Sequence, residues 1–161
     1  MKRLLATIAL VLITATGASA QSMSAGATNT KKGHVDFIAE GQSIAANTPA
    51  TLKLHFRIDQ GFHINSHTPK SEMLIPTKIL VEDLNGAEVT NVDFPAGTPY
   101  SFSFEPNTKL DVYTGEVTLT AHVKAKPGTY TLKAALHYQA CDQAACYPPK
   151  TLPLEQPFTA K

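Results

Sequence analysis

The sequence contains only two cysteines among its 161 residues, Cys141 and Cys146. Two cysteines are too few to form the disulfide framework that holds a small fold together, and a chain of this length does not need one. A run of basic residues is also missing, and the formal net charge is only +1 at pH 7. This charge balance argues against nucleic acid and anionic membranes as partners.

Long apolar runs are missing too, apart from about ten residues near the N-terminus, Leu4 to Ile13. That run is shorter than the ~20 residues that a membrane-spanning helix needs, so we expect no direct insertion into a membrane. Lys2 and Arg3 precede the run, and the small residues Ala18-Ser19-Ala20 follow it. This pattern predicts a cleaved signal peptide over residues 1–20.

The exported chain would begin at Gln21 and carry a formal charge of −1, because cleavage removes two basic residues. Residues 21–33 are rich in small and polar residues without apolar periodicity, so we expect a flexible leader. Residues 34–161 are expected to form one domain with a sizeable core. Export brings the two cysteines into an oxidising compartment, where nearby thiols form disulfides.

Apolar and polar residues alternate with a period of two along much of the domain, which is typical of strands with one buried face. No segment shows the 3.6-residue period of a helix, and turn residues separate the alternating segments. Seven or eight short strands of this kind predict an all-β antiparallel sandwich. The segments are Val35–Phe37, Leu52–Ile58, Ile79–Val81, Val89–Phe94, Val117–Val123, Tyr130–Tyr138 and Leu152–Phe158.

Two longer stretches lack the alternation, Gly61–Pro76 and Pro95–Asn107. Long loops on a rigid sandwich are frequent sites of function. The cysteines lie elsewhere, between the strand that ends at Tyr138 and a last strand that begins near Lys150. The simplest geometry is a β-hairpin whose loop is closed by the two thiols, since facing Cα atoms of such a pair are about 4.5–5.5 Å apart.

A disulfide at this position has two interpretations. As a structural bridge it closes a short loop, for which the chain-entropy model gives only about 2 kcal/mol, and it joins strands that the hairpin already holds together. As a redox-active bridge it lies at a loop tip, where an attacking thiolate can reach it. No basic residue adjoins either cysteine, and Asp142 would raise a thiol pKa, so we predict unremarkable thiol reactivity.

Metal binding is a further alternative. His137 precedes Cys141 by four residues and could join the two cysteines, while His63 and His67 could hold copper or zinc together. The first set lacks the paired spacing that is usual for zinc, and the second set lacks a third ligand. We therefore predict no metal site and no cofactor.

The segment from Tyr138 to Lys150 reads Tyr-Gln-Ala-Cys, four residues, and Cys-Tyr-Pro-Pro-Lys. It resembles the active-site segment of the N-terminal periplasmic domain of the thiol:disulfide interchange protein DsbD. Two further stretches, Gly61–Thr77 and Phe102–Glu116, are similar to segments of the same family in the same order. The resemblance extends from about residue 35 to residue 158.

The resemblance implies an immunoglobulin-like sandwich with both cysteines at one end. It also implies a periplasmic location and a role in thiol:disulfide exchange and cytochrome c biogenesis. It further implies a protein-disulfide reductase type of activity, in which a reduced dithiol passes electrons to disulfide proteins. Large members of the family continue into a membrane domain and a thioredoxin-like domain that this sequence does not contain. We therefore expect a monomer whose partners are separate thioredoxin-like redox proteins or a membrane electron transporter.

The resemblance also assigns candidate site residues. Cys141 and Cys146 would carry the exchange, with the order of attack left open. An aromatic-tipped cap loop shields the cysteines in this family, and Phe102 and Phe104 are the candidates here; core packing is the alternative for both. Tyr138 and Tyr147 would flank the pair, to exclude water or to hold a partner, unless they pack within the sheet edge. A competing hypothesis is a non-catalytic binding module in which the disulfide only shapes a loop.

Overall fold

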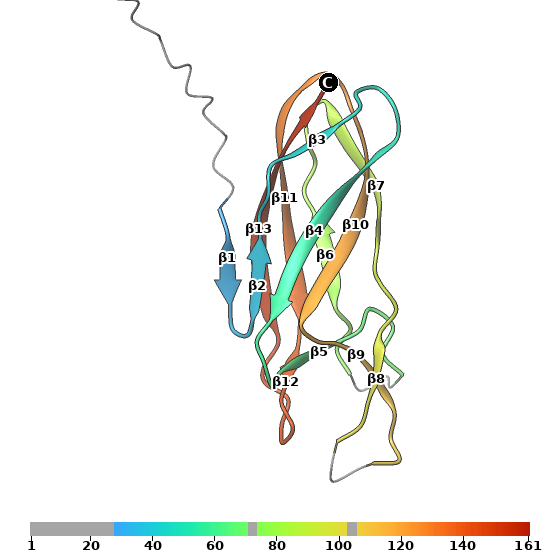
Figure 1. The fold of residues 1–161 in the computed structure, drawn as a ribbon, viewed down its shortest axis with the longest axis vertical. Coiled ribbons are helices and arrows are strands. Elements are labelled where there is room, and N and C mark those ends of the chain that lie inside the picture. The colour runs from blue at the N-terminus through green and yellow to red at the C-terminus, as the bar shows by residue number, and fades with distance from the viewer. Residues whose placement is uncertain (1–27, 71–73, 103–105) are drawn as a thin grey trace, which may run out of the picture.

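The computed structural model describes residues 28–70, 74–102 and 106–161 (Figure 1). The proposed signal peptide, residues 21–27 of the proposed leader, and Phe104 lie outside the described residues. Within them the chain forms strands and no helix, and hence no helix that is long and apolar enough to cross a membrane.

Two larger sheets form the body of the molecule. The first has the order β1-β2-β4-β10-β7 with antiparallel neighbours throughout, and the second has the order β3-β13-β11-β6, in which β3 runs parallel to β13. The strands of the first sheet are β1 (Thr30–Lys32), β2 (Val35–Ile38), β4 (Ala50–Ile58), β7 (Ala87–Asp93) and β10 (Glu116–Ala125). Those of the second are β3 (Gln42–Ile44), β6 (Lys78–Val81), β11 (Gly128–Tyr138) and β13 (Lys150–Ala160).

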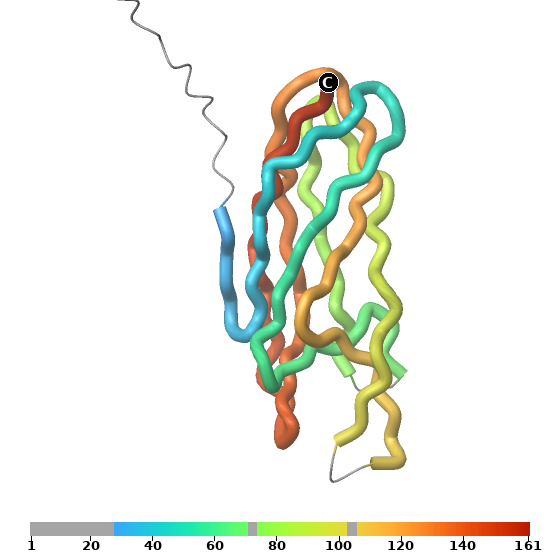
Figure 2. The backbone as a smooth tube through the Cα atoms, in the orientation of Figure 1, coloured from blue at the N-terminus to red at the C-terminus, as the bar shows by residue number. Residues whose placement is uncertain are grey.

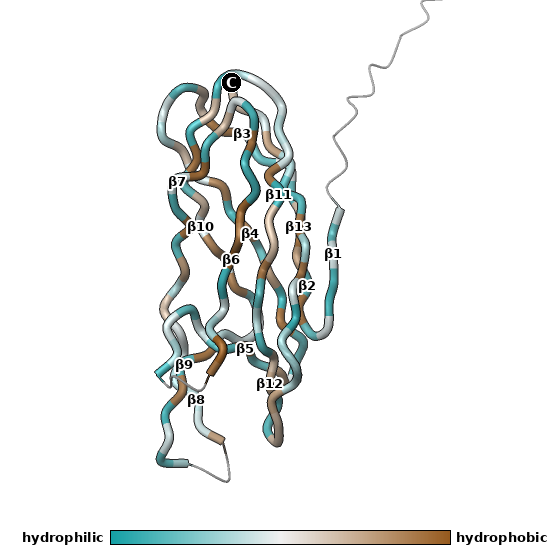
Figure 3. Tube along the Cα trace, turned by 180° about the vertical axis from the view of Figure 1, so that it is seen from behind, coloured by the Kyte–Doolittle hydropathy of each residue, from teal (hydrophilic) through white to brown (hydrophobic). Residues whose placement is uncertain are grey.

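The core lies between these two sheets, and alternation along the strands builds it. Leu52, Leu54, Phe56 and Ile58 of β4 are at most 3% exposed, while their neighbours along the strand face outward. The long strands β10, β11 and β13 contribute alternate residues in the same way, and Figure 3 shows apolar and polar residues alternating along the tube. The predicted all-β, mainly antiparallel sandwich is therefore confirmed.

A third, smaller sheet lies at one end of the sandwich and was not predicted. Its order is β12-β5-β9-β8, and it lies at the end remote from the C-terminus (Figure 2). Two of its strands lie in the two stretches without alternation, because strands of three residues are too short to show a period and all three residues of β5 are buried. The strands are β5 (His63–Asn65), β8 (Thr98–Tyr100), β9 (Leu110–Tyr113) and β12 (Ala140–Cys141).

Strand β1 lies within the segment that we expected to be a flexible leader. Thr30–Lys32 pairs with β2 across a turn at Gly33, whose φ of +58° suits a residue without Cβ. The Tyr138 hydroxyl donates a hydrogen bond to the Lys32 carbonyl and attaches the hairpin to the second sheet. The folded domain therefore begins before residue 34, and the polar composition of β1 explains why its sequence shows no strand pattern.

Candidate functional site

The two cysteines face each other at the end of a hairpin, as predicted. Strands β11 and β13 pair up to Tyr138 and Lys150, and Cys141 forms an isolated antiparallel bridge with Cys146 beyond them. Their Cα atoms are 4.0 Å apart and their sulfur atoms form a disulfide. The Tyr147 amide donates a 2.8 Å hydrogen bond to the Ala140 carbonyl and closes the base of this loop.

The two cysteines differ in exposure. Cys141 is 1% exposed because β12 pairs with β5 of the third sheet, where Cys141 stands opposite His63. Cys146 follows the turn of the loop and is exposed. An incoming thiol or disulfide can therefore approach Cys146 more readily than Cys141.

Asp142 organises the loop between the cysteines. Its Oδ1 accepts hydrogen bonds from the amides of Ala144 (2.7 Å) and Ala145 (2.8 Å), and its Oδ2 accepts one from the Tyr147 hydroxyl (2.6 Å). The Tyr147 hydroxyl first, and then the two amides, lower the pKa of the Asp142 carboxyl to about 2. Because hydrogen bonds to the ionised form favour ionisation, a negative charge stays beside the disulfide at neutral pH.

This arrangement predicts an acid-sensitive loop. The Asp142 pKa lies below the ordinary value of 3.8, so the carboxylate stabilises the loop fully above pH 3.8 and loses that effect as the pH falls toward about 2. We expect the amide proton chemical shifts of Ala144 and Ala145 to titrate with a midpoint near pH 2 in NMR spectra, at the lowered pKa of Asp142. In Asp142→Asn, which keeps an amide oxygen and does not titrate, these shifts should stay constant; a titration with the ordinary aspartate pKa in the unmodified protein would contradict the prediction.

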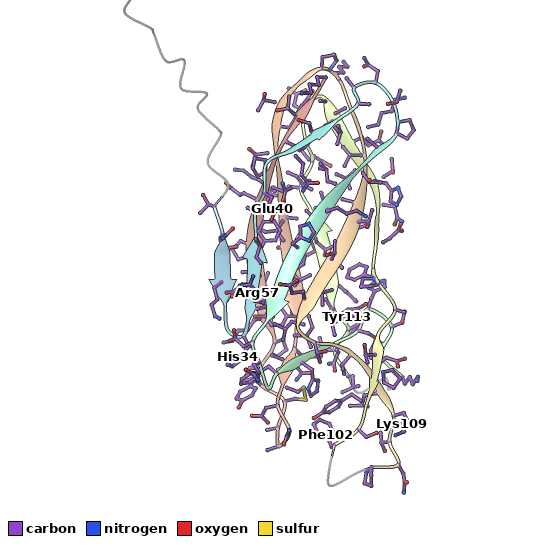
Figure 4. The ribbon with its side chains drawn as sticks, viewed as in Figure 1. His34, Glu40, Arg57, Phe102, Lys109 and Tyr113 are labelled. Atoms are coloured by element: carbon purple, nitrogen blue, oxygen red, sulfur yellow. A yellow bond between two sulfur atoms is a disulfide. The ribbon has the colours of Figure 1, made fainter. Side chains whose placement is uncertain are left out.

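Aromatic rings from three separate segments meet beside the loop. His34, labelled in Figure 4, lies in the turn between β1 and β2, and its ring stacks on Phe62 with centroids 3.6 Å apart. Tyr147 lies against both rings, at 5.6 Å from His34 and 5.9 Å from Phe62. Asp59, at the end of β4, accepts a hydrogen bond from Lys31 Nζ at 2.7 Å, and its Oδ2 lies 3.3 Å from His34 Nδ1. These contacts hold the aromatic cluster against the end of β4.

A second aromatic group covers the other side of the site. The ring of His63 lies 4.1 Å from that of Tyr100, and Phe102 packs edge-on against Tyr100 at 5.5 Å and 5.9 Å from His63. Phe102, labelled in Figure 4, is half-buried in the segment that follows β8. Phe102 therefore contacts His63, which stands opposite Cys141. This position is compatible both with a cap over the cysteines and with local packing.

The two candidate tyrosines have different environments. Tyr138 is 0% exposed and belongs to the core, and burial raises the pKa of its hydroxyl to about 12. It has no exposed surface with which to hold a partner, so packing within the sheet describes it. Tyr147 is 38% exposed beside Cys146 and remains a candidate contact residue.

The histidines that we considered as metal ligands lie in different places. His63 is buried in the third sheet, whereas His67 stacks on Phe94 and its Nδ1 lies 3.0 Å from the Thr77 carbonyl oxygen. His137 faces Thr151 on the outer side of β11, with 3.2 Å between Nδ1 and Oγ1. Across residues 28–70, 74–102 and 106–161, no three metal-ligating side chains come together.

The sequence did not identify four residues of this site as parts of an exchange site: His34, Phe62, His63 and Tyr100. The similarity of Gly61–Thr77 to the DsbD family was the one signal that pointed toward two of them. A pocket of about 550 Å³ opens beside three of these residues, and one residue of the cysteine loop also lines it. Phe62, His63, Tyr100 and Gln143 contribute to its wall.

The N-terminal domain family of the thiol:disulfide interchange protein DsbD matches residues 34–155. No curated protein matches the chain.

The solved structures that are similar to this chain include two N-terminal domains. The N-terminal periplasmic domain of ScsB from Proteus mirabilis is 14% identical with a TM-score of 0.53; the match covers 80% of this chain and 51% of that one, so this chain spans about half its length. The reduced N-terminal domain of DsbD from Neisseria meningitidis is 18% identical over 72% of this chain and 86% of that one, with a TM-score of 0.44.

The family match confirms the expected immunoglobulin-like fold, and with the Cys141–Cys146 disulfide it supports a thiol:disulfide exchange module. The chain belongs to the family of N-terminal domains of the thiol:disulfide interchange protein DsbD.

Proposed function

We propose that this domain relays electron pairs in the periplasm between thioredoxin-like proteins or a membrane electron transporter and other disulfide proteins. The observation that carries the proposal is the disulfide between an exposed Cys146 and a buried Cys141 in a short hairpin loop. In such a loop the exposed sulfur can form a mixed disulfide with a partner, and the buried sulfur can then resolve it. A cleaved signal peptide over residues 1–20 would deliver the domain to this compartment.

The exchange proceeds through a mixed disulfide. In the reduced domain, the Cys146 thiolate attacks a sulfur of the partner disulfide, which forms one S–S bond and releases one partner thiolate. Cys141 then attacks Cys146 Sγ, which restores the intramolecular bridge and releases the second partner thiolate. Two electrons and two protons pass from the domain to the partner, and the reverse sequence reloads the domain. The sulfur atoms carry the electrons, so no cofactor is needed.

The surroundings of the loop favour a partner-controlled reaction. The ionised Asp142 beside the cysteines disfavours a second negative charge on either sulfur, and so it slows the reaction of the free dithiol. Tyr147 and the His34–Phe62 stack on one side, with Phe102 on the other, form a rim on which a partner can replace water. A thioredoxin-like partner would supply the more reactive thiolate.

The reduction potential of the bridge tests this proposal. We expect equilibration with glutathione buffers to give a value above about −300 mV, because structural bridges in secreted proteins typically lie below that value. The ratio of oxidised to reduced domain can be followed by alkylation and mass spectrometry, with Cys146→Ser as the sample that cannot form the bridge. A value below about −300 mV would instead favour the binding module in which the disulfide only shapes the loop.

A further inference from the structure

We propose that His63 takes up the thiol proton of Cys141 when this cysteine closes the disulfide, and returns it when the disulfide opens. The inference rests on the proposed function, because it assigns the acid–base residue of that exchange. It concerns a histidine that the sequence suggested only as a metal ligand.

The pairing of β5 with β12 places the two side chains together. Cys141 and His63 are directly opposite in the antiparallel ladder, and opposite residues project from the same face with Cβ atoms about 4.5–5.5 Å apart. Both are buried, at 1% and 2% exposure. Among the described residues, no group forms a hydrogen bond with the buried His63 Nε2 in the oxidised protein.

A buried polar atom without a partner is costly, so its presence needs a reason. In the disulfide state Cys141 has no proton to share. In the reduced state its thiol is a donor on the same face of the ladder as the ring, and Nε2 has a lone pair that can accept it. The unpartnered nitrogen in the oxidised protein is thus the expected counterpart of a hydrogen bond that forms on reduction.

The charge around His63 supports this role. Burial lowers the pKa of the imidazole, whereas the Asp142 carboxylate raises it and so stabilises a proton on the ring. A neutral ring can accept a proton, and the carboxylate compensates part of its charge once it has done so. The other ionisable groups on the elements that surround the ring are Tyr100 on β8, Asp111 and Tyr113 on β9, and Arg57, Asp59 and Glu116 around the pocket.

Closure of the disulfide releases a proton from Cys141, and another group must accept it. When Cys141 attacks Cys146 Sγ in the mixed disulfide, the S–H bond of Cys141 breaks, the new S–S bond forms, and the partner sulfur leaves with the electron pair. Cys141 is 1% exposed and does not line the pocket, so water has little access to its thiol, whereas the His63 ring lines the pocket. Neutral His63 receives the proton and passes it to water in the pocket of about 550 Å³ that the ring lines, and from there the partner thiolate is protonated.

Oxidation of the reduced domain by dithiobis-nitrobenzoate separates the two steps, since each released thiolate is coloured. The first release reports attack by Cys146, and the second reports closure by Cys141. We expect His63→Phe, which keeps an aromatic ring against Tyr100, to slow the second release by about 100-fold or more at neutral pH, in the range typical of lost general base catalysis. The first release should be unchanged, and the second should lose the pH step that reports imidazole titration.

Two further variants sharpen the result. His137→Phe makes the same replacement on the outer side of β11 and should leave both releases unchanged. His63→Gln keeps a hydrogen-bonding side chain that does not titrate, and should be as slow in the second release as His63→Phe. Full activity of His63→Gln, or an unchanged second release in His63→Phe, would overturn the proposal.

The unmodified protein provides an independent readout if a variant disturbs the fold and alters both releases. NMR titration of the His63 ring should give different pKa values in the oxidised and the reduced protein, because only the reduced protein has a thiol opposite the ring. Identical titrations in the two states would refute the role of His63. These measurements use no protein partner, so a failure to exchange with thioredoxin-like proteins would reject the proposed function and leave this result standing.

Discussion

Replacing Cys141 by serine should leave the domain joined to its partners through Cys146. The variant keeps the exposed cysteine that attacks a partner disulfide and loses the buried one that would release the partner. Turnover should therefore stop, and mixed disulfides should accumulate. Non-reducing electrophoresis of periplasmic extracts, followed by mass spectrometry of the bands that disappear on reduction, would identify the partners.

Cys146→Ser is the matched control. It leaves Cys141, which is 1% exposed under the loop and opposite His63. We expect roughly tenfold less mixed disulfide than in Cys141→Ser, because access to the sulfur limits exchange. Equal trapping by the two variants would contradict the assignment of Cys146 as the partner-facing cysteine, and no trapping by either would contradict the relay.

Replacing Tyr138 by alanine should lower the free energy of unfolding by about 3–5 kcal/mol, as for other large buried aromatic side chains. Tyr138 is 0% exposed, packs in the core, and holds the β1–β2 hairpin through its hydrogen bond to the Lys32 carbonyl. The variant leaves a cavity and a carbonyl without its donor. Urea denaturation of the oxidised protein, monitored by circular dichroism, would measure the loss.

Tyr147→Ala provides the comparison on the other side of the hairpin. Tyr147 is 38% exposed, and its main polar contact is the hydrogen bond to Asp142. This hydrogen bond lies at the exposed surface, where water can replace either partner, so stability should change little. The effect should appear instead in exchange with a protein partner, through the lost aromatic surface beside Cys146. Equal destabilisation by the two replacements would contradict the assignment of Tyr138 to the core.

The long strands were predictable because their evidence is local. In Leu52 to Ile58 and in Tyr130 to Tyr138, every second residue is apolar, and each such run reports a strand with one buried face regardless of its neighbours. The hairpin that joins Cys141 to Cys146 was predictable for the same reason, since both cysteines lie between consecutive strands.

Which strands pair with each other was harder to predict from the sequence. Ile79–Val81 and Val89–Phe94 flank the turn at Asn85-Gly86, yet β6 pairs with β11 and β7 pairs with β10, in different sheets. Alternation with a period of two shows which face of a strand is buried. It does not show which neighbouring strand forms hydrogen bonds with it. The three-residue strands β5 and β8 gave no period at all.

The sequence by itself therefore determined the all-β class, the core faces of the long strands, and the position of the disulfide in a hairpin loop. Only the tertiary structure decided that Cys141 is buried and Cys146 exposed, that Tyr138 is a core residue, and that His63 stands opposite Cys141. The burial of Cys141 and its position opposite His63 depend on the third sheet, in which β5 pairs with β12 across a large separation in sequence, whereas Tyr138 is buried by the main core and by the β1–β2 hairpin. Such a contact is decided by the packing of the whole chain, because residues far apart in sequence leave no local pattern.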